Sequence, residues 1–561
     1  MSKVSQACTK KNLEQTHLEI KKNLVMKNKY INLILCICMH VCAFSQPLLL
    51  WQKTIGGNDY DELRKLCKTK DGGFIAGGLS YSNASGEKSQ NSRGSDDYWI
   101  VKVSSTGKIQ WEKTIGGDGE DNFKSIIQTL DGGYALIGES SSNISGEKTD
   151  YCRGNLDYWL VKLDSSGNIQ WDKTYGGSDV EFIDNIVQGK DGSYILAGSS
   201  LSNASGEKSE NSRGNFDMWV LKVDKDGNKL WDKTIGGNDY DLCSPVKLTK
   251  DGGIILGGFS GSNASGEKSE NNRGVQSDIW VVKLDKNGKI QWDKTIGGSG
   301  DDYCHSLIQT RDGGYLIGGN SNSGISAEKT AKSWGGYDYW LIKLDRYGNK
   351  LWDKTIGGLN DEHDVWSLDS TLDGTGFILG GKSASPISGN KTEYSKGGFD
   401  YWVVKVNKQG NVVWNKTYGG SEDENLYSIV ETEKNKFLLG GNSWSGISGD
   451  KTAASRGLAD YWIVTLKYRV IAPIANSAFT QDSATAISGT GFKVYPNPAR
   501  DILHIQITGK ATVYLTDASG KIIFTKTIDK TDILNVSSLS AGVYYLKNNI
   551  TNETQKIMIV K

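Results

Sequence analysis

The chain has 561 residues, and its 65 lysines and arginines balance its 65 aspartates and glutamates, giving a formal net charge of zero. With no net field to attract phosphates, we do not expect nucleic acid as a partner. The 69 glycines and 17 tryptophans against 6 prolines are typical of a β protein with glycine turns, and a hydrophobic fraction of 37% is compatible with a buried core.

Residues 1–45 have the pattern of a targeting segment. A positive stretch at Met26–Lys29 leads into the apolar run Ile31–Phe44, followed by small residues. The pattern predicts a secretory signal peptide cleaved between Ser45 and Gln46, with Met26 as an alternative start. The apolar run is too short for a stable transmembrane helix, so we expect no transmembrane anchor in the mature chain. A lipoprotein anchor at Cys42 is the alternative interpretation.

The next stretch repeats one block, exemplified by Asp157–Gly177, with a period of about 60 residues. The second tryptophan of the block recurs at Trp51, Trp111, Trp171, Trp231, Trp292, Trp352 and Trp414. Each period predicts four short strands, like residues 306–310, 315–321, 339–344 and 350–356. Asp-Gly-Gly and Asp-x-x-Gly connect them, and we interpret these as plain turns rather than calcium sites.

Four antiparallel strands in a period of about 60 residues predict one blade of a β-propeller. The sequence therefore predicts an all-β chain in which residues 46–468 form a seven-bladed propeller. The first repeat tryptophan has no preceding strands in its period, and residues 426–466 supply three strands without a fourth. We expect Leu48–Gly57 to complete the last blade, which would hide both free edges.

The block itself has a structural interpretation. Tryptophans such as Trp159 and Trp171 should pack blade against blade. The aspartate two residues before the first tryptophan, such as Asp157, should pair with a preceding Arg153 and fix the long loop. The block also resembles the tryptophan-docking repeat of bacterial quinoprotein dehydrogenases. Their longer turn, usual eight blades and neighbouring-cysteine disulfide are absent here, so the resemblance implies shared packing without the cofactor.

A ligand site is expected on the face that carries the long loops. Acidic residues such as Asp61 and lysines such as Lys88 recur on that face, which indicates ion pairing between loops or, alternatively, a metal or ligand ring. Residues that break the repeat are more informative, because the fold does not require them. The candidate ligand-binding residues lie in blades five to seven and are Trp334, Trp366, Trp444, His305 and His363. Exposed aromatic faces stack on sugars or on protein groups.

No stretch predicts a reaction. The sequence contains no Gly-x-Ser-x-Gly elbow, no His-Glu-x-x-His helix and no phosphate loop, and we assign no catalytic residue, metal or cofactor. The sequence favours a binding or adhesion protein with an extracellular glycan or protein ligand. A secreted glycosidase-like hydrolase with two loop carboxylates is the alternative, since propellers do host enzymes.

Residues 469–491 are rich in Ala, Ser and Thr without periodicity, which predicts a linker. Residues 492–561 then show alternating strands around Tyr495-Pro496-Asn497-Pro498, an Asp517–Gly520 turn and Gly542-Val543-Tyr544. This combination resembles the type A C-terminal sorting domain of the type IX secretion system. The resemblance implies a small β-sandwich, a translocon and a sortase-like peptidase as partners, and a secreted or outer-membrane surface-attached product that has crossed the periplasm.

Overall fold

The computed structural model describes residues 47–274, 276–468, 492–495, 499–517, 521–540, 542–550 and 554–560. The chain divides between residues 471 and 472 into two compact units. Within the described residues all regular structure is β, as predicted. The expected signal peptide with its Ser45–Gln46 junction, the 469–491 linker and the motif residues Pro496, Asn497 and Pro498 lie outside the described residues.

The described part of the first unit forms seven four-stranded antiparallel sheets, one for each sequence repeat. Sheets one and two comprise β2 (Asp61–Lys68), β3 (Phe74–Ser80), β4 (Asp97–Val103) and β5 (Ile109–Ile115), then β6 (Asp121–Gln128), β7 (Tyr134–Ser140), β8 (Asp157–Leu163) and β9 (Ile169–Tyr175). Sheets three and four comprise β10 (Glu181–Gln188), β11 (Tyr194–Ser200), β12 (Asp217–Val223) and β13 (Lys229–Ile235), then β14 (Asp241–Leu248), β15 (Ile254–Ser260), β16 (Asp278–Leu284) and β17 (Ile290–Ile296).

The remaining sheets continue the order. Sheets five and six comprise β18 (Asp302–Gln309), β19 (Tyr315–Ser321), β20 (Asp338–Leu344) and β21 (Lys350–Ile356), then β22 (Glu362–Ser370), β23 (Gly376–Ser383), β24 (Asp400–Asn407) and β25 (Val412–Tyr418). Sheet seven combines β26 (Glu424–Glu433), β27 (Lys436–Ser443) and β28 (Asp460–Lys467) with β1 (Leu48–Ile55) from the other end of the unit.

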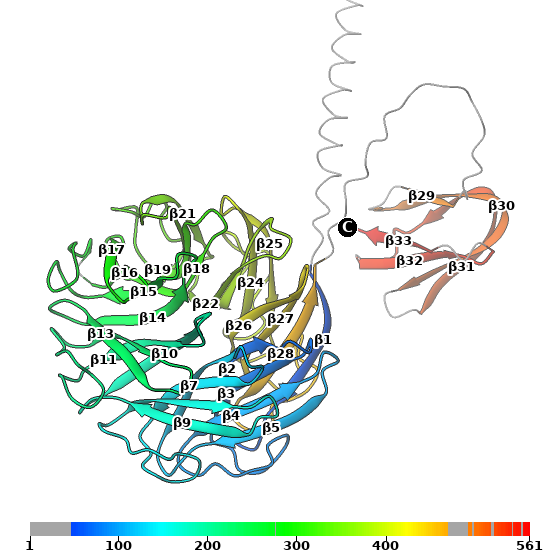
Figure 1. The fold of residues 1–561 in the computed structure, drawn as a ribbon. Coiled ribbons are helices and arrows are strands. Elements are labelled where there is room, and N and C mark those ends of the chain that lie inside the picture. Colours follow the sequence, from blue (N-terminus) through cyan, green and yellow to red (C-terminus); the bar gives the residue numbers. More distant parts are fainter. Residues whose placement is uncertain are drawn as a thin grey trace, which may run out of the picture. The chain divides into compact units, whose positions relative to one another are not determined.

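The sheets are arranged in a closed ring, which is the architecture of a β-propeller (Figure 1). The first strands of neighbouring sheets contact one another all around the ring, and β26 contacts β2 to complete it. The ring closes through β1, which pairs antiparallel with β28, as the missing fourth strand predicted. This closure leaves no free sheet edge at the join between the two ends of the unit.

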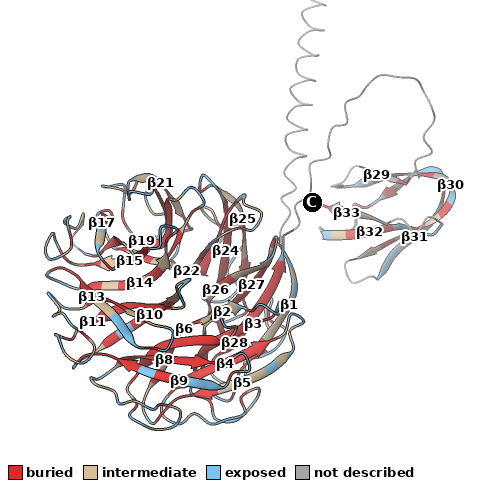
Figure 2. Cartoon of the chain, in the orientation of Figure 1, coloured by how far each residue is buried: buried red, intermediate tan, exposed pale blue. Residues whose placement is uncertain are grey.

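The third strand of each sheet lies in the core. These strands are buried along almost their whole length, whereas the fourth strands are largely exposed or half-buried and become buried at their end (Figure 2). Their tryptophans are fully buried, and each ring packs on an aromatic or apolar residue of the preceding sheet, as Trp159 does on Tyr98 with ring centroids 5.0 Å apart. The indole of Trp159 donates a hydrogen bond to Asp172, at 2.9 Å. The predicted packing role of the tryptophans is thus visible in the core.

In six of the seven repeats the second tryptophan lies closer to the surface and covers the next turn, whereas Trp414 is buried. Trp111 is half-buried, and it lies against Gly167 of the following sheet. Gly167 has a φ of 82°, and a Cβ added there would lie 3.0 Å from the Trp111 ring. Glycine is required at this turn for both its positive φ and its close contact.

The expected Arg–Asp pairing is present in part of the ring, and a second contact also fixes the long loops. The Asp97 carboxylate accepts a hydrogen bond from the backbone N–H of Arg93, at 2.8 Å, and lies 3.6 Å from the Arg93 guanidinium. The same guanidinium also pairs with Glu147 in the loop of the next sheet. Similar pairs join most neighbouring sheets, and Arg456 to Glu87, at 2.7 Å, joins the last sheet to the first. These contacts tie adjacent loops together around one face.

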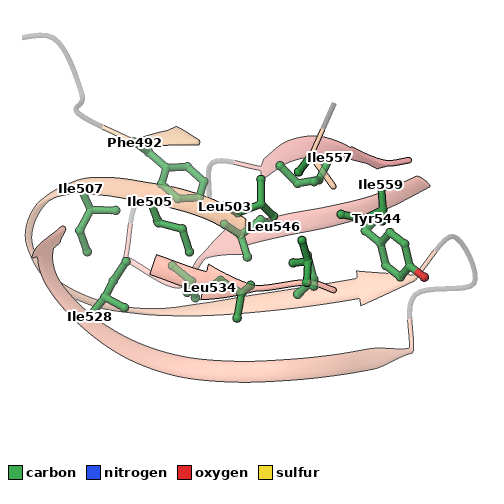
Figure 3. Packing of buried hydrophobic residues seen from close by; sticks show 14 of the residues in the cluster. Phe492, Leu503, Ile505, Ile507, Ile528, Leu534, Tyr544, Leu546, Ile557 and Ile559 are labelled. Atoms are coloured by element: carbon green, nitrogen blue, oxygen red, sulfur yellow. The ribbon is translucent and has the colours of Figure 1, made fainter. Parts of the chain in front are cut away.

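The second unit is a five-stranded sheet of β29 (Lys493–Tyr495), β30 (Ile502–Asp517), β31 (Ile522–Asn535), β32 (Gly542–Asn548) and β33 (Thr554–Ile559). The first half of β30 pairs with β29 and its second half with β32, while β31 pairs along both halves. A register shift at Gly509, whose φ is 80°, separates the two halves. The bent sheet encloses a core that includes Phe492, Leu503 and Leu546 (Figure 3).

Candidate functional site

The first strand of each sheet contains a β-bulge near its start. In β18, Cys304 pairs with Gly319 and Ser306 pairs with Gly318, so His305 between them has no partner across the ladder. The sequence pattern predicted this strand from residue 306, but it begins four residues earlier at Asp302. The bulge interrupts the alternation of side chains, which hid the first half of the strand.

The bulge residues of the seven first strands form one ring, called the bulge ring below. Its members are Arg64, Lys124, Asp184, Ser244, His305, Trp366 and Tyr427. All seven line a single cavity of about 130 Å³ among the first strands. No two members are the same residue, although the surrounding repeats are near copies. The packing of the repeat therefore does not dictate their identities.

One side of the bulge ring is charged. Arg64 pairs with Glu62 at 2.7 Å, and Lys124 pairs with Glu139 at 3.3 Å. The third member, Asp184, has a pKa raised to about 6 by burial, and the charges of Lys124 and Arg64 oppose this rise. This wall therefore presents both donors and acceptors of hydrogen bonds to the cavity.

The opposite side of the bulge ring is aromatic. His305 and Trp366 have ring centroids 4.7 Å apart, and Trp366 and Tyr427 have centroids 6.3 Å apart. All three side chains are half-buried, so part of each ring surface borders the cavity. Burial lowers the pKa of His305, which keeps its imidazole neutral at physiological pH. The structure thus brings together two of the residues that the sequence singled out.

β22 has one residue more than the other first strands, and Trp366 nevertheless occupies the bulge position. His363 pairs with Lys382 and Ser367 pairs with Gly380, so three residues lie in the bulge instead of one. The additional residue, Asp364, has a φ of 65°, a left-handed conformation that costs energy for any residue except glycine. Its carboxylate lies 3.1 Å from the Lys382 ammonium.

His363 belongs to an aromatic row beside the bulge ring. Its imidazole lies 5.1 Å from the Tyr337 ring and 5.9 Å from the Phe399 ring. Tyr337 lies 6.1 Å from Tyr303, and Tyr303 lies 6.3 Å from His305, all between centroids. The Tyr337 hydroxyl donates a hydrogen bond to Asp301 at 3.0 Å. Half-buried aromatic rings with carboxylates between them thus extend from the cavity over sheets five and six.

Trp444 lies on the other side of the bulge ring. Its ring is 6.0 Å from that of Tyr60, whose hydroxyl donates a 2.6 Å hydrogen bond to Glu62. Glu62 in turn holds Arg64, and the guanidinium of Arg64 lies 5.1 Å from the centre of the Tyr427 ring. Trp444 therefore connects to the same cluster as Trp366, through the charged wall.

Trp334 is separate from this cluster. It occupies the loop position that carries Arg or Lys in the other sheets, and it is 52% exposed. Its indole covers Gly389 of the next sheet, and the loop partner is Asn390 where the other sheets have a glutamate or aspartate. Two neutral residues thus stand where the other sheets have the Arg–Glu contact, and Trp334 packs against Gly389 across sheets five and six.

The recurrent acidic and lysine side chains of the long-loop face are buried. Asp61 accepts hydrogen bonds from the Gly57 N–H at 2.6 Å and the Ser82 hydroxyl at 2.9 Å. Lys88 donates to the hydroxyls of Ser80 and Ser92, at 2.9 and 2.8 Å. They form a hydrogen-bonded network under the loops and do not line the cavity. Within the described residues no group of three or more His, Cys, Asp or Glu side chains is placed to hold a metal ion.

Only two members of the bulge ring, His305 and Trp366, were predicted from the sequence, because the candidates were tryptophans and histidines that break the repeat. The available signal was the residue three positions after each repeated acidic residue, which reads Arg, Lys, Asp, Ser, His and Tyr in six of the seven sheets. The seventh, Trp366, is displaced by the additional residue in β22. A position that varies inside an otherwise constant repeat could have indicated the site.

The tail presents its motif residues at the end of the second unit's sheet. Tyr495 ends β29 and pairs with His504. Gly542 begins β32 opposite Ile559, and Tyr544 is buried with its hydroxyl donating a 3.0 Å hydrogen bond to the Ser540 carbonyl (Figure 3). The glycine and tyrosine of this motif thus lie where β32 enters the core.

Comparison with known proteins identifies the tail. Residues 493–561 match the family model of the secretion system C-terminal sorting domain. Over 380 residues the chain is 22% identical to the regulatory protein FlaEY of Caulobacter vibrioides, which covers 62% of this chain and 39% of that protein. The chain thus matches well under two thirds of this relative's length. Among the described residues, no helix has the length and apolar character needed to cross a membrane.

Solved structures similar to the chain include hydrazine synthase of Kuenenia stuttgartiensis, at 9% identity and a TM-score of 0.39, covering 67% of this chain and 92% of that one. The WD40 domain of Neurospora crassa Pan2 gives 10% identity and a TM-score of 0.38, covering 75% and 96%. Drosophila Plexin A, solved with Semaphorin 1b, gives 9% identity and a TM-score of 0.38, covering 76% and 88%. At these TM-scores the similarities carry no functional weight.

Proposed function

We propose, from the premise that a type IX sorting domain at residues 493–561 delivers this chain to the cell surface or the extracellular space, that the propeller binds an extracellular saccharide. The ligand would enter the cavity lined by the bulge ring from the long-loop face. The single observation that supports this proposal is the composition of that ring, which differs in every sheet of an otherwise regular repeat.

The two walls of the cavity suit a sugar ring. A pyranose has an apolar C–H face that stacks on aromatic rings, and its hydroxyls form hydrogen bonds with charged and amide groups. Trp366 and Tyr427 would supply the stacking surface, and Asp184, Lys124 and Arg64 would bind the hydroxyls. The half-buried row of Tyr303, Tyr337 and His363 would extend the contact to further sugar units.

Glycan-array binding by the purified full chain tests the proposal. Trp366→Ala should weaken binding of the best saccharide by about tenfold or more, since stacking on one aromatic ring contributes about 1–3 kcal/mol. Trp334→Ala is the matched control, because this tryptophan lies outside the cluster, and it should change affinity less than about twofold. Unchanged binding by the Trp366 variant, or binding of proteins only, would count against a saccharide ligand.

A glycosidase on the same cavity is the second candidate function. The observation that favours it is the pKa of Asp184, which burial raises to about 6, within the range of a general acid. Incubation of a bound oligosaccharide with the full chain, followed by an assay for new reducing ends, separates the two functions. Cleavage that is lost in Asp184→Asn would support the enzyme, and binding without cleavage would support the binding protein.

A further inference from the structure

A second cavity of about 170 Å³, called the deeper cavity below, lies further along the first strands from the long-loop face. The two cavities share Lys65, Asn185, His305 and Trp366 as lining residues. The two cavities therefore adjoin at these four side chains.

Two lysines border this deeper cavity without a partner. Within the described residues, neither the Lys65 nor the Lys247 ammonium forms a hydrogen bond or an ion pair with a protein group, although both side chains are half-buried. By contrast, Arg64, Lys124 and Lys382, at the first cavity and beside the bulge ring, are each paired with a carboxylate. An unpaired cation in a confined site is costly unless a ligand neutralises it.

The propeller fold does not require either lysine. At the position of Lys65, the other first strands carry serine, asparagine or proline. At the position of Lys247 they carry Cys, Ile, Val or, in sheet six, Asp369. Asp369 also lines the second cavity, so two cations face one carboxylate there and one positive charge remains uncompensated.

We propose that the saccharide ligand carries an anionic substituent, a carboxylate or a sulfate, which enters the second cavity and binds between Lys65 and Lys247 while its sugar ring stacks on Trp366. This inference depends on the proposed saccharide function, and it specifies the class of saccharide. A free inorganic anion would use the lysines alone, whereas an acidic sugar uses both the lysines and the aromatic wall.

Electrostatics supports the assignment. Burial lowers the pKa of Lys65 to about 8 and also lowers that of Lys247, and each lysine or carboxylate in the cavity influences the others. The charged or titratable groups around Lys65 come from its own strand and from the strands around it. They include Arg64 and Cys67 from its own strand, Lys124 from β6, Asp184 from β10, Lys247 from β14, His305 from β18 and Asp369 from β22. Binding of an anion would stabilise the protonated lysines, so affinity should fall as pH rises above about 8.

The experiment compares matched acidic and neutral ligands on the purified full chain by calorimetry. The acidic probes are a hexuronate oligosaccharide and a sulfated oligosaccharide, and each neutral probe is the same oligosaccharide after carboxyl reduction or desulfation. At least one acidic probe should bind about tenfold or more tightly than its neutral form, and the preference should weaken with added salt. Inorganic sulfate alone should bind far more weakly than the sulfated oligosaccharide.

Substitution of each lysine tests whether these two side chains cause the preference for the acidic probe. Lys65→Met and Lys247→Met keep most of the side-chain volume, and each should abolish most of the preference for the acidic probe while leaving affinity for the neutral probe within about twofold. Lys68→Met, an exposed position on the same strand, is the control and should behave as the unmodified chain. Thermal unfolding of each variant checks that the propeller is intact.

The outcomes distinguish failure of the anionic substituent from failure of the proposed saccharide function. If neutral and acidic probes bind equally and Trp366→Ala removes both, the anionic substituent is wrong and the saccharide function stands. If no saccharide binds, both fail. If the acidic preference survives in both lysine variants, the deeper cavity is not the anion site and the inference is overturned.

Discussion

Deletion of Asp364 tests whether the left-handed residue in β22 serves the cavity or the fold. The deletion restores the spacing of the other first strands, because Val365 would then occupy the position of Cys304 and Trp366 the position of His305. Both Val365 and Cys304 are fully buried, so the core should accept the change. The shortened strand keeps its acidic start at Glu362.

The expected change in unfolding free energy follows from two opposing contributions. A left-handed conformation costs about 1–2 kcal/mol for most residues and less for aspartate, and the deletion removes this cost. The deletion also removes the contact between Asp364 and Lys382, a partly exposed pair that contributes about 0–1 kcal/mol. The unfolding free energy should therefore stay unchanged or rise by about 1 kcal/mol.

Urea denaturation followed by tryptophan fluorescence measures this change. Deletion of Ile186 is the control, because this residue is buried and paired with Leu196 in β10, and its loss moves the side chains that follow it to the other face. The control should unfold at a much lower urea concentration. A loss of more than about 2 kcal/mol on deletion of Asp364 would refute the reasoning and make the bulge a requirement of the fold. Retained stability together with weakened saccharide binding would mark it as a feature kept for function.

Three further predictions concern the core, pH and export. Trp219→Phe should lower the unfolding free energy by about 3 kcal/mol, since it removes buried volume and a hydrogen bond to a carboxylate, whereas half-buried Trp231→Phe should lower it by less than about 1 kcal/mol in the same denaturation assay. Burial raises the pKa of Asp97 and Asp217 to about 6, above an unfolded value of about 3.9, so their contribution to stability is present below pH about 4 and is lost as pH rises through about 6. The melting temperature measured by calorimetry should therefore be higher at pH 5 than at pH 7.5, and the reverse order would contradict this. Removal of residues 493–561 should leave the propeller in the periplasm, and surface display of the truncated chain, seen by protease accessibility of intact cells, would refute the role of the tail.

Much of the fold could be predicted because it depends on residues that every repeat shares. The fixed spacing of tryptophans such as Trp159 and of glycine turns such as Gly167 reflects contacts that each sheet must make with the next. The closing role of Leu48–Ile55 followed from counting strand types, without any long-range information. The sorting tail was recognisable because its motifs occur in a fixed order.

The cavity could not be predicted in the same way. A bulge changes which face a side chain occupies, and a sequence gives no direct sign of the extra residue, so Arg64 and Asp184 were not among the predicted candidates. Trp334 is the opposite case, because it was a predicted ligand-binding residue and lies apart from the bulge ring. It breaks the repeat, yet the residue at the facing loop position changes as well, to Asn390, and the Trp334 indole packs on the neighbouring Gly389. A deviation is informative about a ligand only when no neighbour changes to match it.

The pairing of β1 with β28 also has a consequence for the order of assembly. The six other sheets are each built from strands that follow one another closely, so they can form as the chain is made. The seventh cannot form until Lys467 is available to residue Leu48, about 400 positions earlier in the chain. Such distant pairing is slow to establish. Among the described strands of the propeller, β1 is therefore translated first and paired last. Until β1 pairs with β28, its unpaired edge stays open to chaperones or to another chain.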